Sequence, residues 1–207
     1  MTMDDSDSVD KETMLRDFDL LEQKSKGLAK YASDIIAMVR ETHEEITLLP
    51  VNAKEMFEWV FLIAQKEHKE MAVKWEFKSN LSTYFADQNF LRLALLNIIQ
   101  NSIKYCRENT NPEVHIFERT SATSPEDRSV LCIRDFGRGV PEHDLRKIFQ
   151  PFIRGKDEEK DTGFGLGLSL VTKVITIMGG RVWAEIPEDN GYGTTFCIEL
   201  PTKGAAQ

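Results

Sequence analysis

With 207 residues, the chain has the length of one ordinary domain plus an appendage. Its composition, 41% hydrophobic and 29% charged, is typical of a globular protein, and its acidic first residues do not resemble a signal peptide. The formal net charge of −8 argues against nonspecific nucleic-acid binding. No apolar run approaches the ~20 residues needed to span a bilayer. The chain is therefore expected to be cytoplasmic, whether or not the full-length protein is membrane-attached.

The three cysteines are odd in number and lack metal-ligand spacing, which predicts reduced thiols. Cys132 and Cys197 lie in strand-like runs and are expected to be core residues.

Residues 1–46 are predicted to form a unit of their own, made mainly of one long helix. Between residues 11 and 45 there is no proline, and the apolar positions show largely seven-residue spacing: Leu21, Leu28, Tyr31, Ile35 and Met38. This pattern indicates either a coiled-coil or bundle seam or a helix packed on its own domain. Both interpretations stay open.

Residues 47–207 mix strands and helices without regular alternation, which predicts an α/β fold in which helices cover one face of a mixed sheet. We expect strands at 48–52, 72–78, 83–86, 113–119, 130–135, 181–186 and 194–200. We expect helices at 53–68, 90–108, 141–149 and 166–178, with Asp87 as the N-cap of the second. The charged segment 154–163 predicts a mobile loop.

The helix at 90–108 is apolar around most of its circumference, which predicts a buried helix. One polar stripe interrupts it, formed by Asn97, Asn101, Lys104 and Tyr105 at helical spacing. Buried amides and a buried ammonium are costly unless they are paired. The stripe is therefore either satisfied internally or faces a polar ligand, unless the helix is simply a half-exposed amphipathic one.

Three glycine-bearing segments follow that helix. Residues 135–141 read DFGRGVP, in which a carboxylate ending a buried strand suits an exocyclic amine such as that of adenine, although a tight turn is an alternative. Residues 163–169 read GFGLGLS and open a helix, where free N–H groups are expected to form a phosphate site. The alternative is that the glycines form a flexible hinge. Residues 191–196 read GYGTTF, which also fits a hairpin turn.

The order NxxxN, DxGxG, FxxFxRG, GxGLGLxL and GTxF resembles the nucleotide-binding domain of sensor histidine kinases over residues 48–201. A more distant resemblance extends to the type II topoisomerase, heat-shock chaperone and mismatch-repair ATPases. The resemblance implies a two-layer α/β sandwich of the Bergerat type, with ATP held between helices and a mobile lid.

The resemblance also implies roles for individual residues. Asn101 is expected to bind Mg²⁺, Asn97 and Lys104 to lie beside the phosphates, and Tyr105 to flank the base or ribose. Asp135 is expected to accept from the adenine amine. The adenine slot, the lid and the phosphate cradle are expected to include Gly137, Gly139, Val140, Phe149, Phe152, Arg154, Gly163, Phe164, Gly165, Leu166 and Gly167, with Thr194 or Thr195 reaching adenine through water.

Two departures from the family pattern bear on mechanism. Phe136 stands where asparagine is common, which weakens a polar contact but keeps the adenine acceptor. Asn97 stands where related ATPases and serine kinases have a glutamate that activates the nucleophile, and an amide cannot take a proton at neutral pH. The resemblance thus points to ATP held for attack by another protein group, which disfavours a serine kinase of the anti-sigma type.

The acceptor histidine of the family is not found among His43, His68, His115 and His143. His43 is rejected because the family places a second hairpin helix between the acceptor and the ATP-binding helix. The helix in residues 11–45 resembles that second helix of a dimerisation hairpin.

The expected partners are therefore ATP with Mg²⁺, a histidine-bearing dimerisation domain or phosphotransfer protein, a response regulator and no nucleic acid. Whether the N-terminal helix forms a homodimer stays open. The alternative is a nucleotide-dependent regulatory interaction module without phosphotransfer.

Overall fold

A computed structural model of the chain describes residues 13–18, 21–22, 25, 29, 46–124, 127–153, 165–189 and 191–203. Residues 13–18 are helical, but most of the helix predicted between residues 11 and 45 lies outside the described residues, so that prediction stays untested. Among the helices that the structure describes, none is both long and apolar enough to cross a bilayer.

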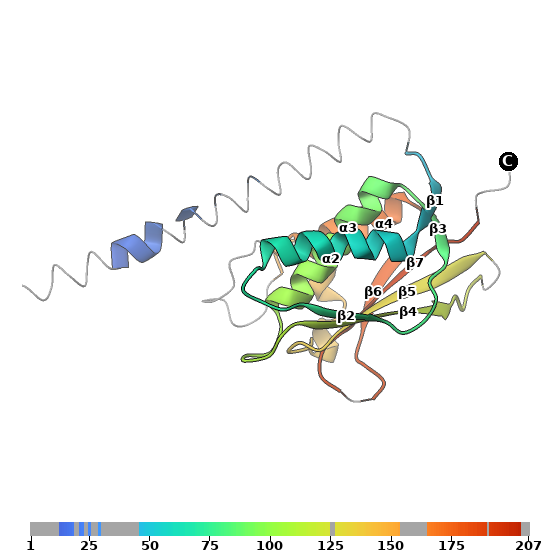
Figure 1. Cartoon of the computed structure of the whole chain (residues 1–207). Helices are drawn as coiled ribbons and strands as arrows, with labels where there is room; N and C mark the ends of the chain where they lie inside the picture. The colour runs from blue at the N-terminus through green and yellow to red at the C-terminus, as the bar shows by residue number, and fades with distance from the viewer. Residues whose placement is uncertain are drawn as a thin grey trace, which may run out of the picture.

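Three helices cover one face of a five-stranded sheet, and a second sheet of two strands lies beside them (Figure 1). The helices are α2 (Ala53–Glu67), α3 (Gln88–Lys104) and α4 (Gly167–Ile177). The five-stranded sheet has the order β2 (Lys74–Phe77), β4 (Glu113–Thr120), β5 (Arg128–Asp135), β7 (Thr195–Pro201) and β6 (Arg181–Glu185). β2 is parallel to β4 and the other pairs are antiparallel. The predicted two-layer α/β fold with a mixed sheet is confirmed.

The two-stranded sheet pairs β1 (Leu49–Asn52) with β3 (Thr83–Ala86) in antiparallel register. The predicted helix at 141–149 is wrong, because this segment forms two short 3₁₀ turns, Glu142–Asp144 and Lys147–Phe149. Neither turn buries a residue fully, so no packed apolar face supports a longer helix.

α3 lies at the centre of the core and packs against both α2 and α4. α3 has the predicted N-cap: one carboxylate oxygen of Asp87 accepts hydrogen bonds from the backbone N–H groups of Asn89 and Phe90. It ends at Lys104, four residues before the predicted end, and Asn109 then takes a positive φ of 58°. Its fully buried side chains include Leu91, Leu95, Ile98, Ile99 and Ile103.

The face of the large sheet opposite the helices, called the outer face here, carries a second, smaller apolar cluster. Cys132 and Cys197 are buried as predicted, but they face each other across β5 and β7 on this side, with their Sγ atoms 3.7 Å apart. Phe117 and Trp183 pack against them. The period of two along a strand explains this placement, because Leu131 and Ile133 then face the helices.

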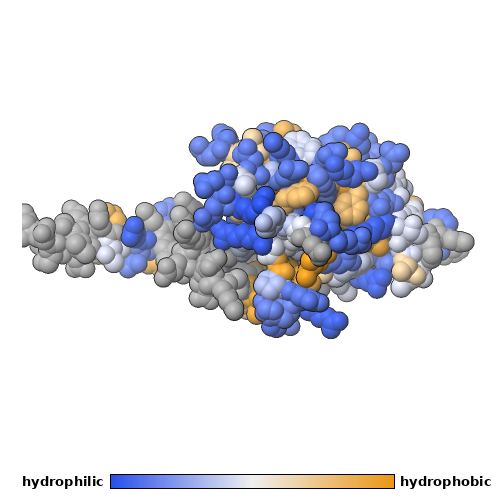
Figure 2. All heavy atoms as spheres, turned by 90° about the horizontal axis from the view of Figure 1, so that it is seen from below, coloured by the Kyte–Doolittle hydropathy of each residue, from blue (hydrophilic) through white to orange (hydrophobic). Residues whose placement is uncertain are grey.

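Charges on the outer face are compensated within the protein. Three arginines each lie over an aromatic ring and pair with a carboxylate: Arg119 with Phe117 and Glu185, Arg134 with Phe136 and Asp189, and Arg181 with Trp183 and Glu199. Figure 2 shows this side of the molecule, where hydrophilic side chains surround a few hydrophobic ones.

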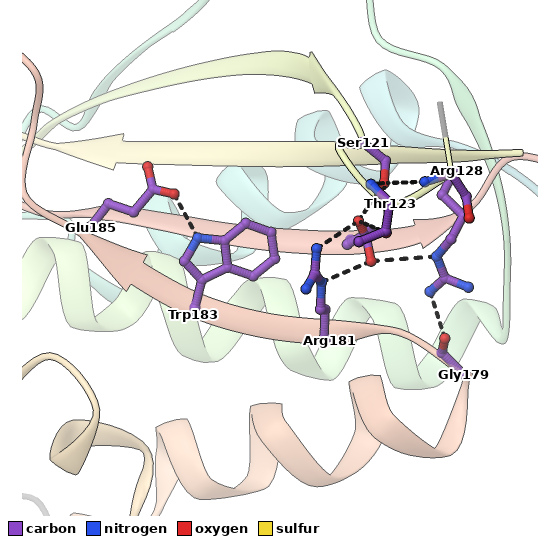
Figure 3. Close-up of polar contacts among 9 residues, drawn as sticks. Ser121, Thr123, Arg128, Gly179, Arg181, Trp183 and Glu185 are labelled. Carbon is purple, nitrogen blue, oxygen red and sulfur yellow. Dashed lines mark hydrogen bonds and ion pairs between the residues drawn. The ribbon is translucent and has the colours of Figure 1, made fainter. Parts of the chain in front are cut away.

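Glu199 is the buried acceptor of a polar network at one end of the outer face. Its partners Ser121, Arg128 and Arg181 are labelled in Figure 3. Its carboxylate accepts from the hydroxyl of Ser121 at 2.5 Å and pairs with Arg181 Nε at 2.8 Å and Arg128 Nε at 3.5 Å. Arg128 also donates to the carbonyl oxygen of Gly179 at 2.6 Å, at the end of α4. Although burial alone would raise it, the pKa of Glu199 is lowered by Ser121 and the two arginines. The network joins β5, β6 and β7 to the helix layer.

Replacing Glu199 by alanine is expected to destabilise the fold by about 1–3 kcal/mol, because it leaves the half-buried guanidinium of Arg128 and the buried hydroxyl of Ser121 without their acceptor. The measurement is the free energy of unfolding from urea denaturation at pH 7. Glu76→Ala is the matched control, since its ion pair with Lys78 is exposed and should contribute little. Equal effects of the two variants would contradict a structural role for the network.

Candidate functional site

Asp135 ends β5 and is one of the few buried carboxylates of the described chain, with 6% of its surface exposed. Its Oδ1 atom accepts hydrogen bonds from the backbone N–H groups of Gly137, at 2.9 Å, and Thr194, at 3.2 Å. The strand period directs it toward the helix layer, as it does Leu131 and Ile133.

Burial raises the pKa of Asp135 to about 6, although the N–H groups of Gly137 and Thr194 and the charge of Arg134 act in the opposite direction. At neutral pH the carboxylate is therefore ionised at a cost in stability. A buried charge with a perturbed pKa is a functional-site candidate.

Three chain segments converge on Asp135. The backbone N–H of Arg138 donates to the carbonyl oxygen of Tyr105 at 3.0 Å, which joins the segment after α3 to the segment after β5. From the other side, the N–H of Asp135 donates to the carbonyl oxygen of Thr194 at 2.9 Å. Gly193 has a φ of +98°, and a Cβ atom there would collide with the carbonyl oxygen of Asp135. The backbone therefore closes tightly behind the carboxylate.

The polar stripe of α3 is only partly as predicted. Asn97 and Asn101 are half-buried, but Lys104 is exposed and Tyr105 is 37% exposed. At this end of the stripe the half-exposed alternative holds, because α3 ends at Lys104 and the Nζ atom of Lys104 lies over the ring of Tyr105, 5.0 Å from the centroid. A charged group at a helix end is free to extend to the surface.

Asn97 links α3 to the start of α4. Its Nδ2 donates to the carbonyl oxygen of Leu93 at 2.8 Å, one turn earlier on α3. Its Oδ1 faces Gly167, where a Cβ atom would lie only 2.8 Å away. The amide is therefore satisfied in part by its own helix, and the glycine allows α4 to begin directly beside it.

The N-terminus of α4 has no side-chain cap: Leu166 occupies that position and is buried. Uncapped N–H groups and the helix dipole favour an anion there. Just before it, Gly165 has a φ of +69° and accepts from the N–H of Phe152 at 2.9 Å. This contact brings together the two ends of the segment 154–164.

The structure brings together several predicted site residues and separates others. One group lies around Asp135 and contains Tyr105, Gly137, Gly139 and Thr194. A second group lies at the start of α4 and contains Asn97, Gly165, Leu166 and Gly167. Val140 is half-buried and follows Gly139, while Arg154, Gly163 and Phe164 lie outside the described residues. Thr195 faces the other way: it lines a cavity of about 420 Å³ on the outer face, because adjacent strand residues alternate between faces.

Phe136, the departure from the family pattern, does not enter the site. Its ring packs edge-on against His115, with centroids 4.6 Å apart, and under the guanidinium of Arg134 at 4.5 Å. Sequence reasoning missed this role, although alternation along β5 predicts that residue 136 points opposite to Asp135. It also missed the contact between Arg107, which belongs to no motif, and Tyr192 of the segment 191–196.

Comparison with known proteins defines the class. A family described as histidine kinase-, DNA gyrase B- and HSP90-like ATPases matches residues 86–204, more than half of the chain. The chain belongs to this family. Among solved structures, the catalytic domain of the histidine kinase ThkA is 26% identical, with a TM-score of 0.60, and the match covers 77% of this chain and all of that one.

Curated relatives identify the branch of the family. The adaptive-response sensory kinase SasA of Gloeothece citriformis is 31% identical over 137 residues, 66% of this chain and 33% of that protein. SasA of Crocosphaera subtropica is 29% identical over 163 residues, 78% of this chain and 40% of that protein. The chain thus spans a third to two fifths of the length of these relatives. It contains an ATP-binding catalytic domain of the two-component histidine kinase type.

Asp135→Asn is expected to stabilise the empty protein by about 2–3 kcal/mol above pH 7, because it removes a buried charge while retaining an oxygen for the two N–H groups. The native pKa of about 6 lies above the ordinary value of 3.8, so Asp135 lowers stability above pH 6 and ceases to do so as the pH falls below about 4. The gain of the variant should therefore disappear across this interval. Urea unfolding at pH 8, 6 and 4 measures it.

Asp189→Asn is the control for this series. Asp189 is exposed and its pKa is lowered by Arg134, so its loss should destabilise the protein at neutral pH, which is the opposite sign. A pH-independent effect of Asp135→Asn would show that its carboxylate is not held as described.

Proposed function

We propose that this protein binds Mg-ATP and presents its γ-phosphoryl group to a histidine outside the chain, as the catalytic domain of a sensor histidine kinase. The observation that carries the proposal is the buried, ionised carboxylate of Asp135, together with the uncapped N-terminus of α4 next to Asn97. In this proposal residues 47–207 form the catalytic domain, and residues 1–46 correspond to the second helix of a dimerisation hairpin.

Adenine recognition is assigned to the Asp135 end of the site. A carboxylate accepts hydrogen bonds only, so it suits the exocyclic amine of adenine and repels a carbonyl oxygen at the same position. Only one of its oxygens is used by backbone N–H groups of the described chain. Tyr105, Gly137, Gly139 and Val140 would line the slot, and Thr194 is better placed than Thr195 to reach the base through water.

Phosphate binding is assigned to the start of α4, where Gly167 lies against Asn97 of α3. The N-terminus of α4 at Gly167 supplies N–H groups, Leu166 and Gly165 lead into it, and Lys104 supplies an exposed positive charge. Gly163, Phe164 and Arg154 would close over the phosphates from the lid, with Arg154 neutralising the γ-phosphate. Bound ATP supplies the phosphoryl group that is transferred.

Magnesium is assigned to Asn101, one helical turn beyond Asn97 on the same side of α3. No group of three or more histidine, cysteine or acidic side chains within the described residues is arranged to hold a metal ion. A single amide ligand fits Mg²⁺ in such a setting, because Mg²⁺ usually keeps several waters and takes further oxygens from substrate phosphates.

The structure supports transfer to a protein group rather than to water. Asn97 stands where a general base would lie, and its amide cannot accept a proton at neutral pH. The Nδ2 group of Asn97 already donates a hydrogen bond to the carbonyl oxygen of Leu93, which fixes the orientation of the amide. The site therefore binds and orients, and the nucleophile must arrive from elsewhere.

The described histidines are poorly placed to be that nucleophile. His115 lies on the outer face against Phe136 and contacts Glu113 at 2.9 Å, while His68 ends α2. His143 is exposed in the first 3₁₀ turn, and His43 lies outside the described residues.

Comparisons support the wider assignment. SasA of Synechococcus elongatus aligns with 89% of the chain, more than residues 47–207 can supply, so its likeness reaches into the N-terminal unit. The solved complex of ThkA with its response regulator TrrA, at a TM-score of 0.63, shows the same fold. We propose a response regulator, a histidine-bearing hairpin and, through residues 1–46, a second copy of the chain as partners.

The full chain should transfer ³²P from γ-labelled ATP to separately produced histidine-bearing helical hairpins, giving an acid-labile, alkali-stable phosphate. Asp135→Asn should lose transfer while folding at least as well as the parent. ATP binding without transfer to any hairpin would overturn the kinase assignment and favour a nucleotide-dependent interaction module.

Asn101→Ala is expected to remove the dependence of ATP affinity on Mg²⁺ and to leave the fold intact. Isothermal titration with ATP, with and without magnesium, measures this difference. Asn89→Ala, an exposed asparagine in the first turn of the same helix, serves as the control. If Asn101→Ala binds Mg-ATP as well as the parent, the metal assignment is wrong.

A further inference from the structure

Arg107 and Tyr192 form a contact that bridges two of the three segments around Asp135. The guanidinium carbon of Arg107 lies over the ring of Tyr192, 4.4 Å from its centroid. Arg107 follows Tyr105, whose carbonyl oxygen is bonded by Arg138, and Tyr192 precedes Gly193, which packs on the Asp135 backbone. The contact therefore joins the segment after α3 to the loop before β7, and both of these segments also contact the Asp135 region.

Arg107 is fixed on its own side of this contact. Its carbonyl oxygen accepts from the N–H of Thr110 at 3.2 Å and from the hydroxyl of Thr110 at 2.8 Å. Its Nε atom is buried and has no hydrogen-bond partner within the described residues. The face of the Tyr192 ring is then the group that stabilises the charge of the Arg107 guanidinium there.

Tyr192 is fixed through the loop that carries it. The carboxylate of Asp189 receives two hydrogen bonds of 2.9 Å from Arg134 and one of 3.0 Å from the N–H of Gly191. The ring of Tyr192 is nevertheless two-thirds exposed, so it contributes little to the core. Both partners are thus anchored locally, and their contact adds a link between the two anchored segments.

We propose that Arg107 and Tyr192 form a clip that positions the Tyr105 and Thr194 backbone against Asp135 and thereby sets the preference of the site for adenine over guanine. This proposal rests on the proposed function, in which Asp135 accepts from the base. Arg107 and Tyr192 are positioning residues, because they act on the base only through the carboxylate of Asp135.

The chemistry of discrimination explains why position matters. Adenine offers an amine donor to the carboxylate, whereas guanine offers a carbonyl oxygen that repels it. Rejection of guanine is strong only while the carboxylate stays dehydrated and fixed, because water or a small rotation would relieve the repulsion. Since Gly193 and Gly137 already touch the backbone around Asp135, a small outward shift of the loop before β7 admits water.

The test compares ATP and GTP affinities of the full chain, by isothermal titration with magnesium, for the parent, Tyr192→Ala, Tyr192→Phe and Arg107→Ala. A cation–π contact of this exposure predicts that the ratio of the two affinities falls about threefold to fivefold in both alanine variants. Tyr192→Phe keeps the ring and should keep the ratio. The double variant should show no further loss, because both changes remove the same contact.

Arg92→Ala is the matched control: Arg92 lies over the ring of Trp59 at 4.7 Å, on the surface between α2 and α3, and its loss should leave the ratio unchanged. An equal loss of ATP and GTP affinity in Tyr192→Ala would indicate a merely structural contact and overturn the clip. An unchanged ratio in both alanine variants would overturn it as well. If the parent itself fails to bind ATP, the proposed function falls instead, so the two failures are distinguishable.

Discussion

Two backbone N–H groups directed at one buried carboxylate are the interaction on which the candidate site depends. Gly137 and Thr194 donate to Asp135 from opposite sides, so two loops distant in sequence must meet at the end of β5. Glycines at 137 and 193 make this approach sterically feasible. Burial still raises the pKa of the carboxylate, which means that the empty protein keeps a costly charge. Such a local conflict with stability is expected where a ligand completes the structure.

Much of the fold could be predicted from sequence because its signals are local. The Asp87 cap, the apolar surface of α3 and the alternation of β4 and β5 each depend on residues close in the chain. The 141–149 segment was mispredicted, since a helix pattern there lacks the packed face that tertiary structure must supply. The pairing of β1 with β3 outside the main sheet was also beyond local reasoning, because only long-range contacts specify it.

In the candidate site, too, features set by local sequence were predictable and features set by long-range contacts were not. Motif order selected Asn97, Asp135 and Gly167. In the structure Asn97 lies against Gly167, and Asp135 is buried at the end of β5. Sequence could not give the orientation of side chains at helix and strand ends. Lys104 therefore proved exposed, and Thr195 and Phe136 proved to face away from Asp135. The contact of Arg107 with Tyr192 joins positions far apart in the chain, so no local pattern in the sequence predicts it.

α3 contributes both to the core and to the candidate site, which restricts how the length of this helix can change. One side of the helix fills the core through Leu95, Ile98 and Ile99. On another side Asn97 faces the start of α4, and Asn101 follows one turn later. Each residue turns the helix by about 100°, so inserting a single residue before Asn97 would rotate one part of the helix relative to the other. Either both amides would then point into the hydrophobic core, or aliphatic side chains would point away from it. Length variation among descendants of this chain should therefore accumulate in the loops and leave the residue count of α3 untouched.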